Sequence, residues 1–194
     1  MRKSIQLLLG IVLMVSSSVL MAQRKLTEAT ISYDIVINTS NTVPQAADLL
    51  DGATSVIYLK GNSSRSEMVS SLGTQATIID GKTGDVTILK DYGEQKYMIM
   101  MTQDNWKQSN KKYEGVSFTY FNEYKTIVGY NCQKAIGTLA DNSTFTVYFT
   151  KELVPVNKDF QYLNKTLPGL ALQYEASFND TATTEIYTLS LHDA

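Results

Sequence analysis

Short segments in which apolar and polar residues alternate run through most of this sequence, and they constrain its fold more than any other feature. Ile31, Tyr33, Ile35 and Ile37 alternate with mostly polar neighbours, which is the period-two pattern of a strand with one buried face. Little helical pattern separates such segments, so we expect a mostly antiparallel β domain. Further strands are expected at residues 55–60, 65–70, 76–79, 86–89, 96–102, 117–121, 125–128, 133–139, 145–150 and 170–174, and another near residue 186.

Residues 96–102 differ from the other expected strands because they are apolar on both faces. Tyr97, Ile99 and Met101 share one face, and Met98 and Met100 share the other. Such a strand is typical of a sheet that is covered on both sides, so we expect it to be buried. Methionines can also bind copper, but neighbouring methionines on opposite faces cannot join one site. We therefore expect them to fill the core.

Residues 103–114 are the best helix candidate. Asp104 stands near the expected start and Gly115 follows the expected end. Trp106 and Tyr113 are seven residues apart, which places them on one helix face. This face either docks the helix on the sheet or forms a lid over a lipid-sized cavity.

The first 22 residues have the pattern of a secretory signal peptide. Arg2 and Lys3 form a basic start, residues 5–15 are mostly apolar, and Ala22 precedes a polar sequence. The alternative is a single membrane anchor, but this stretch lies near the lower length limit of about 17–25 residues for a span. We expect cleavage after Ala22 and an exported protein, periplasmic or at the surface of a Gram-negative cell. No later segment is apolar enough to span a bilayer.

The last seven residues, 188–194, match one frame of a translated sequencing adapter. If they are an artefact, the native chain is read to about Tyr187, and His192, the only histidine, is not native. The alternative is an ordinary last strand from Glu185 to Leu191. We expect one domain at residues 23–187 that lacks its native C-terminal end.

Charge and cysteine content exclude several classes of protein. Without Arg2 and Lys3, 15 of the 17 basic residues remain against 19 acidic ones, a net charge of −4. This disfavours nucleic acid as a partner and gives no polybasic attraction to anionic membranes. The single cysteine, Cys132, cannot form an internal disulfide. We expect it to be a small buried residue, with a reactive or pairing thiol as the alternative.

The near absence of histidine removes the common catalytic constellations. Serine or cysteine nucleophiles with a histidine base, and histidine-based metal sites, have no support here. A carboxylate pair of the glycosidase type remains conceivable, but nothing selects two of the 19 acidic residues. We therefore expect no enzyme, no cofactor and no metal.

Three stretches in order resemble a known family. Residues 127–135 contain Gly-Tyr-Asn-Cys-Gln-Lys-Ala, residues 145–153 form an aromatic strand that ends in Thr-Lys-Glu-Leu, and residues 167–170 read Leu-Pro-Gly-Leu. This order resembles the GLPGLI family and a related family of uncharacterised exported Gram-negative proteins. The sequence departs from the GLPGLI signature at Thr166 and Ala171.

The resemblance implies a fold like that of the lipoprotein carriers LolA and LolB. In that fold a strongly curved antiparallel sheet forms an open half-barrel, and one or two short helices pack on its concave side. The GLPGLI-like families have no assigned activity, so a ligand is implied only by analogy of fold.

We expect a non-enzymatic envelope protein that binds a lipid, a lipoprotein acyl chain or another hydrophobic ligand in the half-barrel. The alternative is a structural or protein-interaction module of the envelope with a filled core. A large apolar pocket would favour the first, and a flat apolar surface patch the second. The residues expected near the cavity are Trp106, Phe118, Tyr120, Phe145 and Phe149, and Arg65 is expected either to contact a head group or lid or to pair with Glu67.

Overall fold

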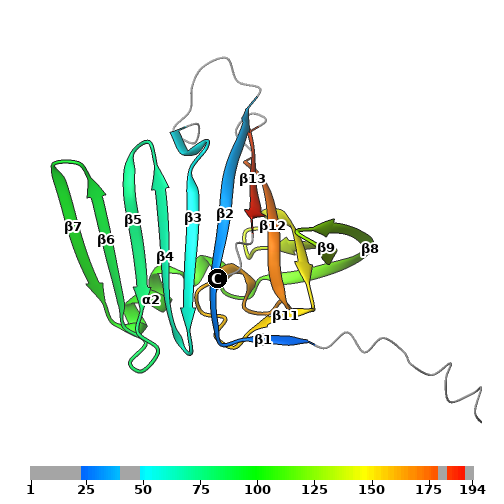
Figure 1. The fold of residues 1–194 in the computed structure, drawn as a ribbon, viewed down its shortest axis with the longest axis horizontal. Helices are drawn as coiled ribbons and strands as arrows, with labels where there is room; N and C mark the ends of the chain where they lie inside the picture. Colours follow the sequence, from blue (N-terminus) through cyan, green and yellow to red (C-terminus); the bar gives the residue numbers. More distant parts are fainter. Residues whose placement is uncertain (1–22, 40–48, 179–182, 191–194) are drawn as a thin grey trace, which may run out of the picture.

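The computed structural model of the protein describes residues 23–39, 49–178 and 183–190. Within them, one antiparallel sheet of eleven strands holds almost all of the secondary structure (Figure 1). From one edge to the other the strands are β7 (Gln95–Met101), β6 (Val86–Tyr92), β5 (Gly73–Ile79), β4 (Ser63–Ser70), β3 (Thr54–Lys60), β2 (Glu28–Thr39), β13 (Thr183–Ser190), β12 (Leu170–Phe178), β10 (Thr144–Thr150), β9 (Tyr130–Thr138) and β8 (Ser117–Ile127).

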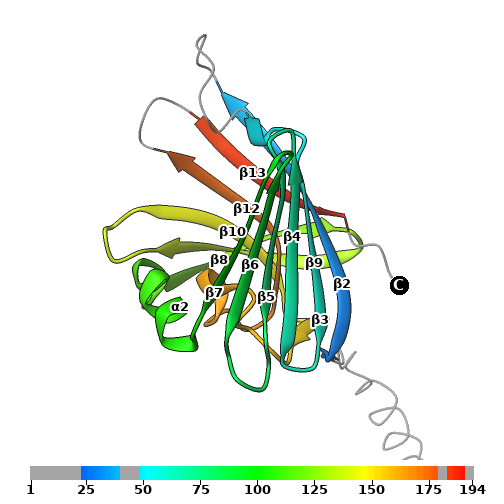
Figure 2. The ribbon, with the colours of Figure 1, turned by 90° about the vertical axis from the view of Figure 1, so that its left-hand side faces the viewer.

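A second, smaller sheet joins β1 (Arg24–Leu26) and β11 (Leu153–Pro155) in parallel. The prediction of a mainly antiparallel β domain is confirmed. Figure 2 shows that the strand direction rotates along the large sheet: β4 to β7 run nearly vertically in this view, whereas β8 and β10 run across it. This rotation follows the right-handed twist of strands, which accumulates from one neighbour to the next.

Most of the predicted strands are present, and two of them are one strand. Residues 117–121 and 125–128, expected separately, belong to β8, whose register with β9 shifts between Tyr120 and Tyr124. The extra residues form a bulge that local alternation reads as a break. At the other end of the chain, Thr188–Ser190 lie within β13, which pairs with β2 and β12. The adapter origin of residues 188–194 stays a prediction, because a backbone path does not report where a sequence came from.

The predicted helix is shorter than expected. Helix α2 (Gln103–Ser109) starts at an N-cap where Thr102 Oγ1 accepts from the Asn105 amide, and a short 3-10 turn, η2 (Lys111–Tyr113), follows. Asn110 is the C-cap of this helix, and both its backbone amide and its side-chain amide donate to the Trp106 carbonyl oxygen. Trp106 and Tyr113 therefore do not share one helix face, contrary to the prediction. None of the helices in the described residues is long and apolar enough to cross a membrane.

Two buried clusters hold the sheet together on its β8 side. One joins β2 and β3 to β12 through residues that include Ile31, Ile57 and Leu172. The other lies between β9, β10 and the segment that precedes β12, and it includes Phe149 and Leu167. That segment contains a 3-10 turn, η3 (Tyr162–Asn164). A small third cluster forms around Ile35 at the far ends of β2 and β3.

Candidate functional site

Four of the five residues predicted near a cavity come together on β8 and β10. The rings of Phe118 and Phe145 meet edge to face with centroids 5.9 Å apart, and those of Tyr120 and Phe149 meet in the same way at 5.7 Å. These contacts reach across β9, where a Cβ atom on Gly137 would collide with the Phe145 ring. The register of the three strands thus brings the aromatic residues together.

These aromatic residues fill a core. Phe145 and Phe149 are buried in the cluster that contains Val147 and Leu167, and Phe118 packs against it half-buried. Only the Tyr120 ring is largely exposed. A role of this group in ligand binding stays a prediction.

Trp106 and Arg65 lie elsewhere. Trp106 is half-buried on α2, which packs against β7, and its indole Nε1 has no hydrogen-bond partner among the described residues. Arg65 lies on the face of β4 opposite to the buried Ser64, where its guanidinium Nε donates to Glu67 Oε1 at 2.7 Å. The predicted ion pair between Arg65 and Glu67 is confirmed.

A buried polar network ties the segment before β12 to the sheet. The Tyr33 hydroxyl donates to the Ala171 carbonyl oxygen at 2.9 Å and accepts from Gln161 Nε2 at 2.8 Å. Its ring packs against that of Tyr174 at 6.2 Å between centroids. Burial raises the pKa of Tyr33, although the hydrogen bond from Gln161 lowers it in part. Burial also raises the pKa of Tyr174. Both hydroxyls therefore act as neutral structural groups.

The motifs shared with the GLPGLI-like pattern meet in the same region. Cys132, Thr150 and Leu170 are fully buried, and a Cβ atom on Gly169 would overlap the Thr150 carbonyl oxygen. Burial raises the pKa of the Cys132 thiol to about 11, and the predicted buried cysteine is confirmed. The close approach at Gly169 gives these motifs a packing role.

One small pocket lies beside η2. Its volume is about 200 Å³, and its lining includes Tyr113, Glu114, Tyr162 and Lys165. The Tyr162 hydroxyl donates to Glu114 Oε1 at 3.0 Å, and Lys165 Nζ lies 2.6 Å from an Asp159 carboxylate oxygen. Its charged groups are thus already paired, and it is smaller than the roughly 300–1,000 Å³ of typical ligand sites.

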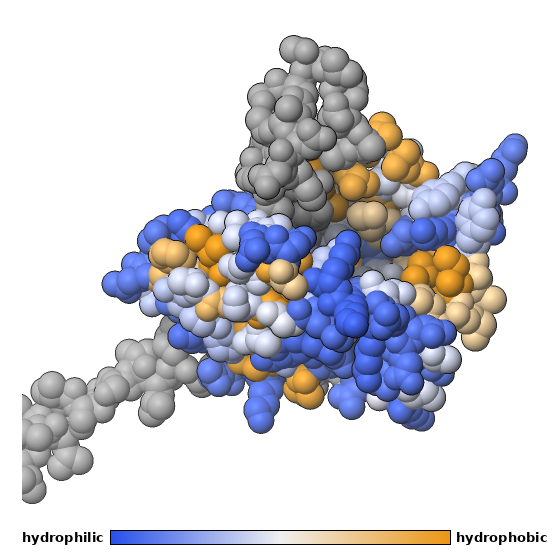
Figure 3. Space-filling view, turned by 180° about the vertical axis from the view of Figure 1, so that it is seen from behind, coloured by the Kyte–Doolittle hydropathy of each residue, from blue (hydrophilic) through white to orange (hydrophobic). Residues whose placement is uncertain are grey.

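The most unusual surface of the described chain is the outer edge of β7. We call its five apolar residues, Tyr97, Met98, Ile99, Met100 and Met101, the β7 edge. The exposed fraction is 49% for Tyr97, 66% for Met98, 43% for Ile99 and 76% for Met100. Figure 3 shows the side opposite to Figure 1, where hydrophilic residues cover the middle and hydrophobic residues gather at the right-hand margin, on the β7 side.

The prediction that this strand is buried on both sides is wrong, and so is the prediction that Met98 and Met100 fill the core. β7 is the last strand of its sheet, and α2 covers neither Met98 nor Met100. An apolar pattern on both faces is common to strands in the middle of covered sheets, but pairing order decides whether a strand lies there. No local signal in residues 95–101 distinguishes the two positions.

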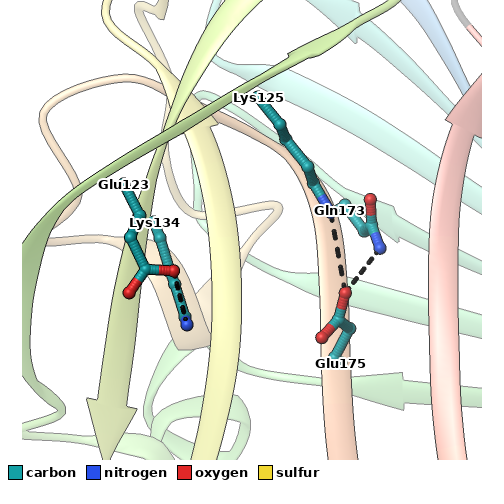
Figure 4. Close-up of polar contacts among 5 residues, drawn as sticks. All are labelled: Glu123, Lys125, Lys134, Gln173 and Glu175. Atoms are coloured by element: carbon teal, nitrogen blue, oxygen red, sulfur yellow. Dashed lines mark hydrogen bonds and ion pairs between the residues drawn. The ribbon is translucent and has the colours of Figure 1, made fainter.

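The opposite edge, β8, carries charged residues that are held in place (Figure 4). Lys134 Nζ lies 2.9 Å from Glu123 Oε2, and Lys125 Nζ lies 3.7 Å from Glu175 Oε1. The Gln173 amide also donates to Glu175 at 2.7 Å. The Lys125 ammonium lies 3.4 Å from the centroid of the Tyr148 ring.

In this arrangement at β8, each of the two lysine side chains lies near a carboxylate. Partial burial lowers the pKa of Lys125, while the nearby Glu175 opposes that shift. Within the described residues, no three histidine, cysteine or acidic side chains are grouped closely enough to hold a metal ion. The ion pairs therefore fix the charged side chains of this edge.

Comparisons with solved structures find distant likenesses. The chain resembles PNGF-II in its C2 crystal form with a TM-score of 0.44 and 11% identity, over 86% of this chain and 28% of that one. The P21 form gives 0.44 and 14%, over 87% and 29%. MucB gives 0.41 and 10%, over 86% and 54%. The chain thus spans about half of MucB and less than a third of PNGF-II.

No curated protein matches this sequence. A family model does match, over residues 46–177, which include β3 to β11, all of β12 but its last residue, and the three motif stretches quoted above. The match covers more than half of the chain, and the protein belongs to the DUF4412 family, whose domain is described as one of unknown function.

Proposed function

We propose that this protein is a non-enzymatic interaction module of a Gram-negative cell envelope, and that the β7 edge is its binding surface. The observation that carries the proposal is the exposure of Met98 and Met100 on one face of β7 and of Tyr97 and Ile99 on the other. Export to the envelope rests on the signal-peptide pattern in residues 1–22, which lie outside the described residues.

An edge strand with apolar residues on both faces is suited to strand addition. Its outward backbone amide and carbonyl groups can pair with an added strand, while its side chains supply apolar contact on both faces. Methionine suits such a surface because its flexible thioether adapts to different partners. Isolated soluble proteins usually protect such strands with charges, prolines or bulges, and β7 has one lysine, Lys96, at its start.

The packing of the predicted cavity residues also favours an interaction module over an enclosed carrier. Phe145 and Phe149 are buried among other core residues. The pocket beside η2 is too small for a long acyl chain and has paired charges in its wall. A filled core with an apolar patch at the surface is the arrangement expected of a protein that binds a protein.

A second candidate function, binding of a lipid or acyl chain, is favoured by one further observation. The strand register places Ile88 and Ile99 in line with the buried Ile57, with Ser66 and Thr77 between them, yet Ile88 is half-buried and Ile99 is exposed. A strongly curved, LolA/LolB-like half-barrel would turn this row toward Trp106 and the aromatic residues of β8. Each buried methylene would contribute about 0.8 kcal/mol.

Site-specific photo-crosslinking separates these candidates. A photoreactive amino acid at Met98 in the full chain, expressed in its natural host, should yield a protein adduct. The matched control places the photoreactive amino acid at Tyr124, on the β8 edge with an exposed fraction of 54%, and should yield no protein adduct. A lipid adduct at Met98 would favour the second candidate, and no adduct at Met98 would refute the proposed binding surface.

A further inference from the structure

We infer that the occupant of the β7 edge is β7 of a second copy of this chain, paired antiparallel about a two-fold axis at Ile99. The inference rests on the proposed function, since it names the partner of the same surface. In Figure 1, β7 is the outermost element on its side of the described chain, so no other part of the fold stands beyond it in that view.

The side chains of β7 complement themselves in this register. With Ile99 opposite Ile99 of the second copy, Tyr97 faces Met101 and Met98 faces Met100, each twice by symmetry. Tyr97, Ile99 and Met101 share one face and Met98 and Met100 the other, so every pair joins apolar residues on the same face. The exposed side chains on both faces are therefore covered together.

The single charged residue of β7 is also compatible with this register. The only charged residue of β7 is Lys96, whose Nζ lies 2.8 Å from Asp91 Oδ2 on β6. In the proposed pair it faces Thr102, an exposed neutral residue, and the two copies of Lys96 lie at opposite ends. No like charges come directly opposite each other, which would weaken a strand pair.

Pairing of β7 with β8 of a second copy is the main alternative, and the β8 edge opposes it. That edge has a bulge between Tyr120 and Tyr124, and Glu123 and Lys125 are engaged in ion pairs. Bulges and charges are the devices that keep edge strands unpaired. A head-to-tail contact would also leave a β7 edge uncovered at one end of the assembly, whereas a two-fold contact covers the β7 edges of both copies.

Cysteine cross-linking tests the partner and the register together. Protein from cells that express the full chain is prepared with Met98→Cys and, separately, with Met100→Cys. Directly opposite residues have Cβ atoms about 4.5–5.5 Å apart, and diagonal ones about 7–8 Å. A mixture of the two variants should therefore form disulfide-linked dimers several-fold faster than either variant alone. Cys132 is kept, because its fully buried side chain is not accessible to a cysteine of the second copy.

A charge substitution provides a second measurement. Wild-type protein should sediment as a dimer at micromolar concentration, and Met100→Lys should raise the dimer dissociation constant by about tenfold or more. The control Val69→Lys places the same charge on an exposed residue of β4 away from the edge and should leave the dimer intact.

Three results would overturn the inference. These are a wild-type monomer at high concentration, equal cross-linking of the mixture and the single variants, or faster cross-linking of Met98→Cys alone. A monomer whose Met98 position still crosslinks to a different envelope protein refutes self-pairing and leaves the proposed function standing. A monomer with no protein adduct refutes both.

Discussion

The two edge strands of the large sheet, β8 and β7, both have one side without a neighbouring strand, and they differ in how far that side is protected against pairing. β8 ends the sheet with a bulge, with Glu123 and Lys125 in ion pairs, and with a filled aromatic core behind it. β7 ends it with a regular strand whose exposed residues from Tyr97 to Met100 are apolar. One edge is protected against pairing and the other is suited to it.

The β8 side of the sheet contributes buried residues that stabilise the fold, and the β7 side carries the proposed binding surface. The aromatic residues that a sequence reader would assign to a ligand site stabilise the β8 side. The methionines that a reader would assign to the core are exposed on the β7 side. Substitutions at the two edges should therefore have opposite consequences for stability and for association.

The largest expected effect is on the β8 side. Phe149→Ala should lower the free energy of unfolding by about 3–5 kcal/mol, because it removes a fully buried ring and leaves a cavity. The matched substitution Met100→Ala should change it by no more than about 0.5 kcal/mol when measured on the monomer. Urea denaturation at low protein concentration measures both. Similar losses would show that β7 is buried after all.

A smaller contrast is expected between two tyrosines. Tyr33→Phe removes a buried hydroxyl that serves the Ala171 carbonyl and the Gln161 amide, and it should cost about 1–3 kcal/mol. Tyr97→Phe removes an exposed hydroxyl bonded to Gln95 at 3.0 Å, and little change in denaturation midpoint is expected. The comparison fails if the two variants unfold at the same urea concentration.

Alkaline pH should weaken the side of the molecule that contains Cys132, Tyr33 and Tyr174. Burial raises all three pKa values, so the folded state keeps protons that the unfolded state has lost. The stability contributed by these three groups should be fully present below about pH 9, the ordinary pKa of the thiol, and should be lost as the pH rises from there through about 11 and beyond. Thermal unfolding from pH 7 to 11 measures this. Cys132→Ala should remove the earliest part of the decline, and an unchanged profile in that variant would contradict its assignment to the thiol.

The smallest effect is expected for exposed ion pairs. Lys96→Ala at the β7 edge breaks a pair whose lysine side chain is 71% exposed, and it should cost no more than about 0.5 kcal/mol. Lys134→Ala breaks a pair whose lysine is 25% exposed and also lies 5.7 Å from the centre of the Phe121 ring, so a larger loss of stability is expected than for Lys96→Ala. Raising the salt concentration should shrink both differences. A larger loss for Lys96→Ala would reverse the proposed difference between the edges.

Local pattern predicted most elements of the fold because strand alternation is a property of neighbouring residues. The alternation of Ile31, Tyr33, Ile35 and Ile37 matches the burial observed in β2. The spacing of Arg65 and Glu67 on one strand face likewise predicted their ion pair. Helix α2 was also placed correctly, although it ends at Ser109 and not at residue 114.

The candidate site could not be predicted in this way. The apolar pattern of residues 97–101 is the same whether the strand lies in the middle of a sheet or at its edge. The burial of Phe145 likewise depends on its position over Gly137 and beside Phe118, residues that come from other strands.

The sequence by itself therefore determined most of the segments that become strands, that Cys132 is buried, and that the structure is mainly antiparallel β. Only the tertiary structure decided that β7 is an edge, that Phe118, Phe145 and Phe149 pack in a core, and that Met98 and Met100 are exposed. Periodicity acts over a few residues along the chain. Exposure depends on which distant segments pair and pack, and in this sheet the order of the strands leaves β7 without a second neighbour.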